Sequence, residues 1–139
     1  MSLDLSKIGA VVLAAGRGTR LNCVEKSKVM LEIGNKPIVS YIIETLKSVG
    51  FKKKQICLVV GFKKEKVMEY FGDSVIYTVQ KEQKGTAHAA HVGIKSLPKT
   101  IETVLVLGGD DSAFYTKKTL LDFIKKHIEA GAKLSLLAV

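Results

Sequence analysis

The stretch VVLAAGRGTRL, residues 11–21, joins an apolar run to a loop with two glycines and two arginines. The apolar run starts at Ile8 and ends in Ala-Ala-Gly, which is typical of a strand buried on both faces. Glycine lets the backbone approach an anion closely and donate N–H groups to it, and guanidinium groups bind phosphate oxygens in pairs. The stretch therefore predicts a buried strand followed by an anion-binding loop.

Two well-known phosphate-binding motifs do not fit this loop. A dinucleotide-binding G-x-G-x-x-G would need a third glycine where the sequence has Leu21, and the G-x-x-x-x-G-K-[ST] of a P-loop is absent from the sequence. What remains is the run Gly16-Arg17-Gly18-Thr19-Arg20, with Lys28 eight residues after Arg20. Three cations on one loop suit a triphosphate, although a strand-to-loop turn with surface arginines would give the same spacing.

Strands and helices alternate along the rest of the chain. Apolar runs predict further strands at residues 56–60, 75–79, 103–107 and 134–139, and apolar residues at helical spacing predict helices between them. Such alternation predicts a single α/β domain with a Rossmann-like doubly wound fold, in which helices cover both faces of a mainly parallel sheet.

The periodicity also predicts how each helix is placed. For the first helix we expect Asn35 as N-cap, Pro37 in the first turn, and Gly50 at the end. The side chains expected to face the core are Ile38, Ile42, Ile43, Leu46 and Val49 in that helix, Val67, Met68 and Phe71 in the second, Ala87, Ala90, Ile94 and Leu97 in the third (86–97), and Leu120, Phe123, Ile124 and Ile128 in the fourth (117–130).

Composition and charge narrow the classes of partner. The chain has 139 residues, and its 22 Lys+Arg against 13 Asp+Glu give a net charge of +9, which attracts anions. The lysines are scattered, and neither a nucleic-acid-binding motif nor an aromatic stacking cluster is present, so we do not expect nucleic acid as a partner. The sequence contains no long apolar stretch, no signal peptide, and no metal spacing at Cys23 or Cys57, so we expect a cytoplasmic protein that does not bind membranes.

In sheets of this kind, ligands bind beyond the carboxyl ends of the strands. Three groups of polar residues stand there, at 14–28, 80–86 and 108–112. Gln80, Gly85 and Thr86 could recognise a base edge that presents carbonyl and imide groups, whereas Gly85-Thr86 is equally an ordinary helix start with Thr86 as the cap. Asp110 ends an apolar strand and is a candidate Mg²⁺ ligand, because Mg²⁺ is held by one or two carboxylates and the phosphates of its substrate. Asp111 is a partner for it or a turn residue.

Three segments together resemble a known family: LAAGRGTRL with EKSKVMLEIGNKPIVSYIIETLKSVG after it, QKEQKGTAHAA, and VLVLGGDDS. They are similar to the signature of the sugar-1-phosphate nucleotidyltransferases (NDP-sugar pyrophosphorylases), most of all the uridylyltransferase domain of N-acetylglucosamine-1-phosphate uridyltransferase. The resemblance implies that a nucleoside triphosphate, UTP, is joined to a sugar 1-phosphate and that pyrophosphate is released.

The resemblance also implies roles for particular residues. It assigns the metal, Mg²⁺, to Asp110. It assigns catalytic roles to Arg17, Arg20 and Lys28, and nucleotide binding to Leu13, Ala14, Ala15, Gly16, Gly18, Thr19, Gln80, Gly85 and Thr86. By contrast, His88 and His91 are expected to be surface or core histidines, because no acid or nucleophile stands at a spacing that pairs with them.

The chain departs from the family signature at several positions. Arg17 stands where the signature has lysine, Ser27 where it has proline, and Asp111-Ser112-Ala113 where it has apolar residues or proline. We expect residues 1–139 to be the nucleotide-binding half of such a domain, ending before the sugar-binding half. The alternative is a module that binds a nucleotide without completing the transfer. The sequence implies no oligomeric state.

Overall fold

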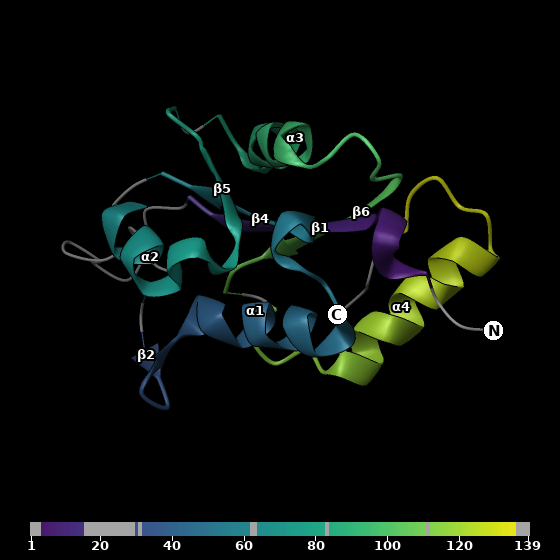
Figure 1. Ribbon diagram of the computed structural model, residues 1–139, viewed down its shortest axis with the longest axis horizontal. Coiled ribbons are helices and arrows are strands. Elements are labelled where there is room, and N and C mark those ends of the chain that lie inside the picture. Colours follow the sequence, from purple (N-terminus) through teal and green to yellow (C-terminus); the bar gives the residue numbers. More distant parts are fainter. Residues whose placement is uncertain are drawn as a thin grey trace.

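A parallel sheet lies between two layers of helices in the computed structural model (Figure 1). The structure describes residues 4–15, 30, 32–61, 64–82, 84–110 and 112–135. The strands are β1 (Ile8–Ala14), β2 (Glu32–Ile33), β3 (Lys36–Pro37), β4 (Ile56–Val60), β5 (Ile76–Val79) and β6 (Thr103–Gly108). The helices are α1 (Ile38–Val49), α2 (Lys64–Phe71), α3 (Thr86–Ser96) and α4 (Lys117–Glu129), with short 3-10 turns at Leu5–Lys7, Lys53–Gln55 and Gly72–Ser74.

The main sheet has the order β5-β4-β1-β6, and all its neighbouring strands are parallel. The chain runs from β1 through β4 to β5 and then returns past β1 to β6. Because each crossover is right-handed, a helix lies on one face of the sheet when the chain moves toward β5 and on the other face when it moves back toward β6. This reversal explains why α1 and α2 share a face and α3 lies on the other. The doubly wound fold expected from the sequence is therefore confirmed.

The two central strands are buried on both faces. Ala10, Val12 and Ala14 of β1 pack with Leu46 of α1 and Leu120 of α4, on the side where α1 and α4 lie together (Figure 1). On the other side, Val11 of β1 and Val59 of β4 pack with Ala89 of α3. Apolar side chains in both directions are what a central parallel strand requires.

The inward face of α3 differs from the one predicted. Ala87 is exposed and Ile94 is 43% exposed, whereas Ala89 and Gly93 are buried and Leu97, just after the helix, is buried as expected. A Cβ added at Gly93 would stand 2.5 Å from Val11 Cγ1, so the helix lies against the sheet through its smallest residues. The prediction failed because it placed the largest apolar side chains inward.

The start of α1 also differs from the prediction. Asn35 is not the N-cap: it has φ 68° and, with Gly34 at φ 62°, forms the two-residue turn of the β2–β3 hairpin. Positive φ at both positions is what a type I′ hairpin turn needs, and Gly-Asn satisfies it. Pro37 occupies the N-cap, and Gly50 ends the helix as predicted, its N–H bonding to Lys47 O at 3.1 Å.

Near the end of the described chain, α4 buries Leu120 and Ile124 as predicted and half-buries Phe123, whereas Ile128 is 43% exposed. The strand predicted at 134–139 is wrong for Leu134 and Ser135, which belong to no strand, while residues 136–139 lie outside the described residues. An apolar run forms a strand only where a partner strand accepts its hydrogen bonds.

Met68, predicted to face inward on α2, is 38% exposed, and Val67 is the fully buried side chain there.

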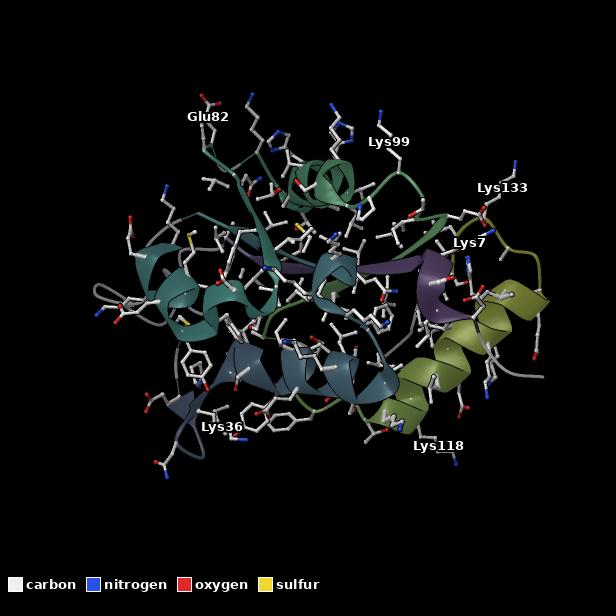
Figure 2. All side chains as sticks on the ribbon, viewed as in Figure 1. Lys7, Lys36, Glu82, Lys99, Lys118 and Lys133 are labelled. Carbon is white, nitrogen blue, oxygen red and sulfur yellow. The ribbon has the colours of Figure 1, made fainter. Side chains whose placement is uncertain are left out.

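The lysines lie on separate parts of the surface. Figure 2 shows Lys7, Lys36, Lys99, Lys118 and Lys133 projecting outward from different elements. This distribution agrees with the scattered pattern in the sequence. No helix of the described chain is long and apolar enough to cross a membrane.

Candidate functional site

The carboxyl ends of all four parallel strands lie along one edge of the sheet. Ala14 pairs with Val60, and Val60 pairs with Val79. The hydrogen bonds of the sheet continue one residue past β5 and one residue past β6. Gln80 N–H bonds to Val60 O at 2.8 Å, and Gly109 N–H bonds to Leu13 O at 2.9 Å. The segments predicted to bind a nucleotide and a metal therefore begin side by side at this carboxyl edge.

Gly61 joins two of these segments. A Cβ added at Gly61 would stand 3.2 Å from Ala15 Cβ and 3.2 Å from Gln80 O. Both separations are tighter than an ordinary van der Waals contact. The backbone at Gly61 therefore holds the end of β1 and the residue after β5 at a fixed, close spacing.

Gln80 is a buried polar residue at this edge. Its Nε2 lies 3.4 Å from Gly85 O, to which it donates, and 3.0 Å from His88 Nδ1. The residue is only 6% exposed, so its amide needs partners inside the protein. The Gly85 carbonyl oxygen and the His88 ring nitrogen hold that amide in place at the start of α3.

The residues after Gln80 form the start of α3. Gly85 is the N-cap, with φ 99° in the region that favours glycine, and Thr86 is the first helical residue. No side-chain hydrogen bond caps the helix, so the expectation that Thr86 is the cap is wrong. Gly85 and Thr86 are both exposed. They lie next to the Gln80 side chain, whose amide contacts Gly85 O.

Asp110 follows β6 at the same edge, one residue after the Gly109–Leu13 hydrogen bond. It is half-buried in a turn in which Ala113 N–H bonds to Asp110 O at 3.3 Å. Ser112 is 1% exposed, and its hydroxyl and its N–H both bond to Gly108 O. This buried serine fixes the turn that carries the predicted metal ligand.

Several predicted residues lie outside the described part of the chain: Gly16, Arg17, Gly18, Thr19, Arg20, Lys28 and Asp111. Their roles stay predictions. Among the predicted site residues that are described, the sheet brings Leu13, Ala14 and Ala15 to one edge with Gln80 and Asp110.

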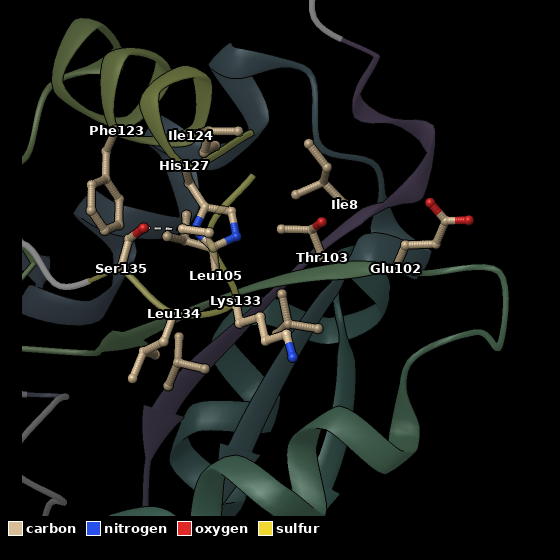
Figure 3. Close-up of a pocket in the computed structure, with 13 residues that line it drawn as sticks. Ile8, Glu102, Thr103, Leu105, Phe123, Ile124, His127, Lys133, Leu134 and Ser135 are labelled. Carbon is tan, nitrogen blue, oxygen red and sulfur yellow. Dashed lines mark hydrogen bonds between the residues drawn. The ribbon is translucent and has the colours of Figure 1, made fainter. Parts of the chain in front are cut away.

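A pocket of about 460 Å³ lies elsewhere, beside β6 (Figure 3). It is lined by the first residues of β6 from Thr103, by Phe123 and His127 of α4, and by residues 132–135. Figure 3 shows His127 turned toward Ser135, whose Oγ lies 2.7 Å from His127 Nδ1. Because the pocket lies along the amino-terminal part of β6, it is distinct from the carboxyl edge.

Two side chains on the neighbouring strands β4 and β5, the buried Cys57 and the half-buried Tyr77, have altered acidity. Burial raises the pKa of the Cys57 thiol in β4 above its usual range. Burial, and then the charge of Asp73, raise the pKa of Tyr77 in β5, whose hydroxyl donates to Gly72 O at 2.6 Å. Both groups therefore keep their protons in ordinary buffers.

The sequence interpretation missed two residues of this edge. Gly61 directly follows a strand predicted correctly, and a glycine in that position is a signal of close backbone approach. His88 was expected to be an ordinary surface or core histidine, but its ring nitrogen contacts Gln80. The helix start at Thr86 is the signal that could have found it, because His88 lies in the first turn and so faces back toward the loop.

Comparison with known proteins identifies relatives of this chain. The bifunctional protein GlmU of Symbiobacterium thermophilum is 39% identical over 134 residues, which are 96% of this chain and 28% of that relative's length. The chain thus spans less than a third of that relative.

Solved structures share the fold. Rv0371c of Mycobacterium tuberculosis H37Rv superposes with a TM-score of 0.70 at 21% identity, over 93% of this chain and 62% of its own. The 4-diphosphocytidyl-2C-methyl-D-erythritol synthase of Anaerococcus prevotii gives a TM-score of 0.68 at 21% identity, over 91% of this chain and 53% of its own.

The sequence profile of one family accounts for nearly all of the chain. That family is described as nucleotidyl transferase, and its profile matches residues 9–139, from the start of β1 through the whole carboxyl edge. The chain therefore belongs to the nucleotidyl transferase family.

Proposed function

We propose that this chain binds UTP at the carboxyl edge and that the protein transfers the uridylyl group to a sugar 1-phosphate. The observation that carries the proposal is the convergence of Leu13–Ala15, Gln80 and Asp110 at one edge, from strands far apart in the sequence. A nucleotide laid across this edge would place its base near Gln80 and its phosphates beside the end of β1 and Asp110.

In the proposed reaction, a phosphate oxygen of the sugar 1-phosphate attacks the α-phosphorus of UTP. A new P–O bond forms there as the bond to the bridging α,β-oxygen breaks, and pyrophosphate carries that oxygen away. Such a transfer needs positioning and charge neutralisation more than covalent chemistry by the protein. Arg20 and Lys28 would bind the phosphates, and Arg17 would stabilise the leaving pyrophosphate.

The proposed metal is Mg²⁺, with Asp110 as its protein ligand. A carboxylate is the hard oxygen donor that Mg²⁺ prefers, and one such ligand with substrate phosphates makes an ordinary site. No group of three or more His, Cys, Asp or Glu gathers in the described part of the chain. When bound, Mg²⁺ would neutralise charge on the α- and β-phosphates. One structure of Rv0371c, with a TM-score of 0.67 to this chain, is a manganese complex, so Mn²⁺ is the second metal to test.

The roles at Gln80, Gly85 and Thr86 belong to recognition of the base. The Gln80 amide is a hydrogen-bonding group held in a fixed orientation, and exposed backbone at Gly85 and Thr86 lies next to it. We propose the substrates as partners, a cytoplasmic location, and no binding of nucleic acid or membranes. An excess of unlabelled oligonucleotide that displaces UTP would contradict the last point.

The test is pyrophosphate release by the full-length protein with Mg²⁺ or Mn²⁺, with each ribonucleoside triphosphate or dTTP, and with a panel of sugar 1-phosphates. We expect release with UTP and at least one sugar phosphate. No release with any pair, while UTP still binds, would favour the alternative of a nucleotide-binding module without transferase activity. Preference for CTP would contradict the role given to Gln80.

A substitution at Asp110 tests its proposed role as the metal ligand. Asp110→Asn keeps the size of the side chain but removes its charge, so we expect at least about a hundredfold loss of turnover while binding of UTP without metal changes little. Asp122→Asn on the exposed face of α4 is the matched control and should retain full turnover. Equal loss in both variants would count against Asp110.

A further inference from the structure

A side-chain contact at the carboxyl edge joins His88 to Gln80. Gln80 Nε2 is an amide nitrogen and can only donate, so His88 Nδ1, at 3.0 Å, must accept. An acceptor role for Nδ1 requires the tautomer that carries the ring proton on Nε2. His88 therefore serves as a hydrogen-bond acceptor for the buried amide.

The second contact of the amide fixes its orientation. Gln80 Nε2 also lies 3.4 Å from Gly85 O. If the amide were rotated by half a turn, its oxygen would face that carbonyl oxygen, and two acceptors would be opposed. Because Gly85 O and His88 Nδ1 both contact Nε2, Oε1 is the atom of the amide that meets the base in the proposed pose.

We propose that His88 is a positioning residue which sets nucleotide specificity through Gln80, an inference that rests on the proposed function. Uracil presents a donor, N3–H, between two carbonyl groups. Cytosine in the same pose presents an unprotonated N3, which is an acceptor and would oppose Gln80 Oε1. An amide locked with its oxygen outward thus favours UTP over CTP, whereas an amide free to rotate would offer its NH₂ group to cytosine as readily.

The burial of Gln80 makes this orientation matter. At 6% exposure the amide has little access to water, so losing the His88 acceptor would leave an N–H group without that partner. Gly85 O, at 3.4 Å, then holds the amide through one contact in place of two, so rotation that presents NH₂ in place of oxygen costs less than in the wild type. The effect of His88 should therefore appear in the choice of base more than in the rate of transfer.

The experiment measures kcat/KM for UTP and for CTP with the full-length protein and variants at position 88. His88→Phe keeps a flat ring without an acceptor, and His88→Asn keeps an acceptor oxygen near the place of Nδ1. We expect His88→Phe to lower the UTP-to-CTP ratio about tenfold, the size of one hydrogen bond, through KM and not kcat. His88→Asn should restore most of the ratio, and His91→Phe, exposed one turn along α3, should not change it.

A double-mutant cycle separates positioning from a general structural effect. If His88 acts through Gln80, His88→Phe should have no further effect on the ratio in a Gln80→Ala background. An active, UTP-selective enzyme in which Gln80→Ala lowers the ratio but His88→Phe does not would overturn the inference alone. Failure of the wild-type protein to turn over any nucleotide would instead overturn the proposed function on which it rests.

A measurement without turnover tests the contact directly. Nitrogen-15 NMR of the wild-type protein at neutral pH should show His88 with an unprotonated Nδ1 and a protonated Nε2. A proton on Nδ1 would contradict the inference, because that nitrogen could not accept from Gln80. This test needs no variant to fold.

Discussion

Gly93 of α3 lies so close to Val11 of β1 that a Cβ added to the glycine would stand 2.5 Å from Val11 Cγ1. Val59 Cγ2 would be 2.8 Å away on the neighbouring strand. We expect Gly93→Ala to destabilise the protein by about 1–2 kcal/mol, since overpacking between two stiff valines outweighs the gain of up to about 1 kcal/mol in helix propensity. Urea unfolding measures this, with the half-exposed Ile94→Ala as the control. A stabilised Gly93→Ala variant would show that α3 is free to move away from the sheet.

Gly61 gives a prediction about nucleotide binding. Gly61→Ala would place a methyl group 3.2 Å from Gln80 O and from Ala15 Cβ, so the ends of β1 and β5 would have to separate by a few tenths of an ångström. We expect KM for UTP to rise about fivefold, with less than about 1 kcal/mol lost in stability. Gly72→Asn is the control, because a Cβ at Gly72 meets nothing within 4 Å and asparagine tolerates its φ of 54°. Unchanged KM would mean that this spacing does not affect the nucleotide.

Tyr77 gives a prediction about alkaline pH. Burial and then Asp73 raise the pKa of Tyr77 in the folded protein above the ordinary value of 10.0. A raised folded pKa means that the folded state holds the proton more tightly, so the resulting stability is complete below the unfolded pKa and is lost as pH rises through the folded one. We expect the urea midpoint to fall above about pH 10, and to fall less in Tyr77→Phe. Tyr70→Phe, 49% exposed, should behave like the wild type. Parallel pH curves for Tyr77→Phe and the wild type would contradict the prediction.

Cys57 gives a prediction about thiol chemistry. The residue is fully buried, and burial raises the pKa of its thiol, so little thiolate is present and little of it can be reached. In a Cys23→Ser background, we expect Cys57 to react with an alkylating reagent at least about a thousandfold more slowly in buffer than in urea. The reason is that the reagent reaches the thiol only in molecules that have unfolded. The unfolded protein provides the reference rate. Rapid native labelling would show that β4 opens locally without global unfolding.

The elements of this fold were predictable because a buried parallel strand and an amphipathic helix have clear periodicities. β1, β4 and the end of α1 at Gly50 lie where the sequence places them. The buried face of α3 was not predictable in the same way. Hydrophobicity alone selects Ile94 for the core, whereas the close approach of helix and sheet selects Gly93, and that approach depends on Val11 and Val59, which are distant in sequence.

The carboxyl edge was predictable in outline for the same reason. The rule that parallel strands end together led to Gln80 and Asp110 without knowledge of their neighbours. What the sequence could not supply is the partner of a buried side chain. His88 looks ordinary in the sequence, and only the folded chain shows its ring nitrogen 3.0 Å from the Gln80 amide nitrogen.

The return of the chain past β1 has a consequence for folding during synthesis. Ile8 at the start of β1 pairs with Thr103, so one side of β1 can acquire its partner only after Thr103 has left the ribosome. Long-range parallel pairing of this kind forms slowly, and an unpaired apolar strand invites aggregation in the meantime. Truncation before β6 should therefore yield an aggregating chain and not a smaller soluble domain.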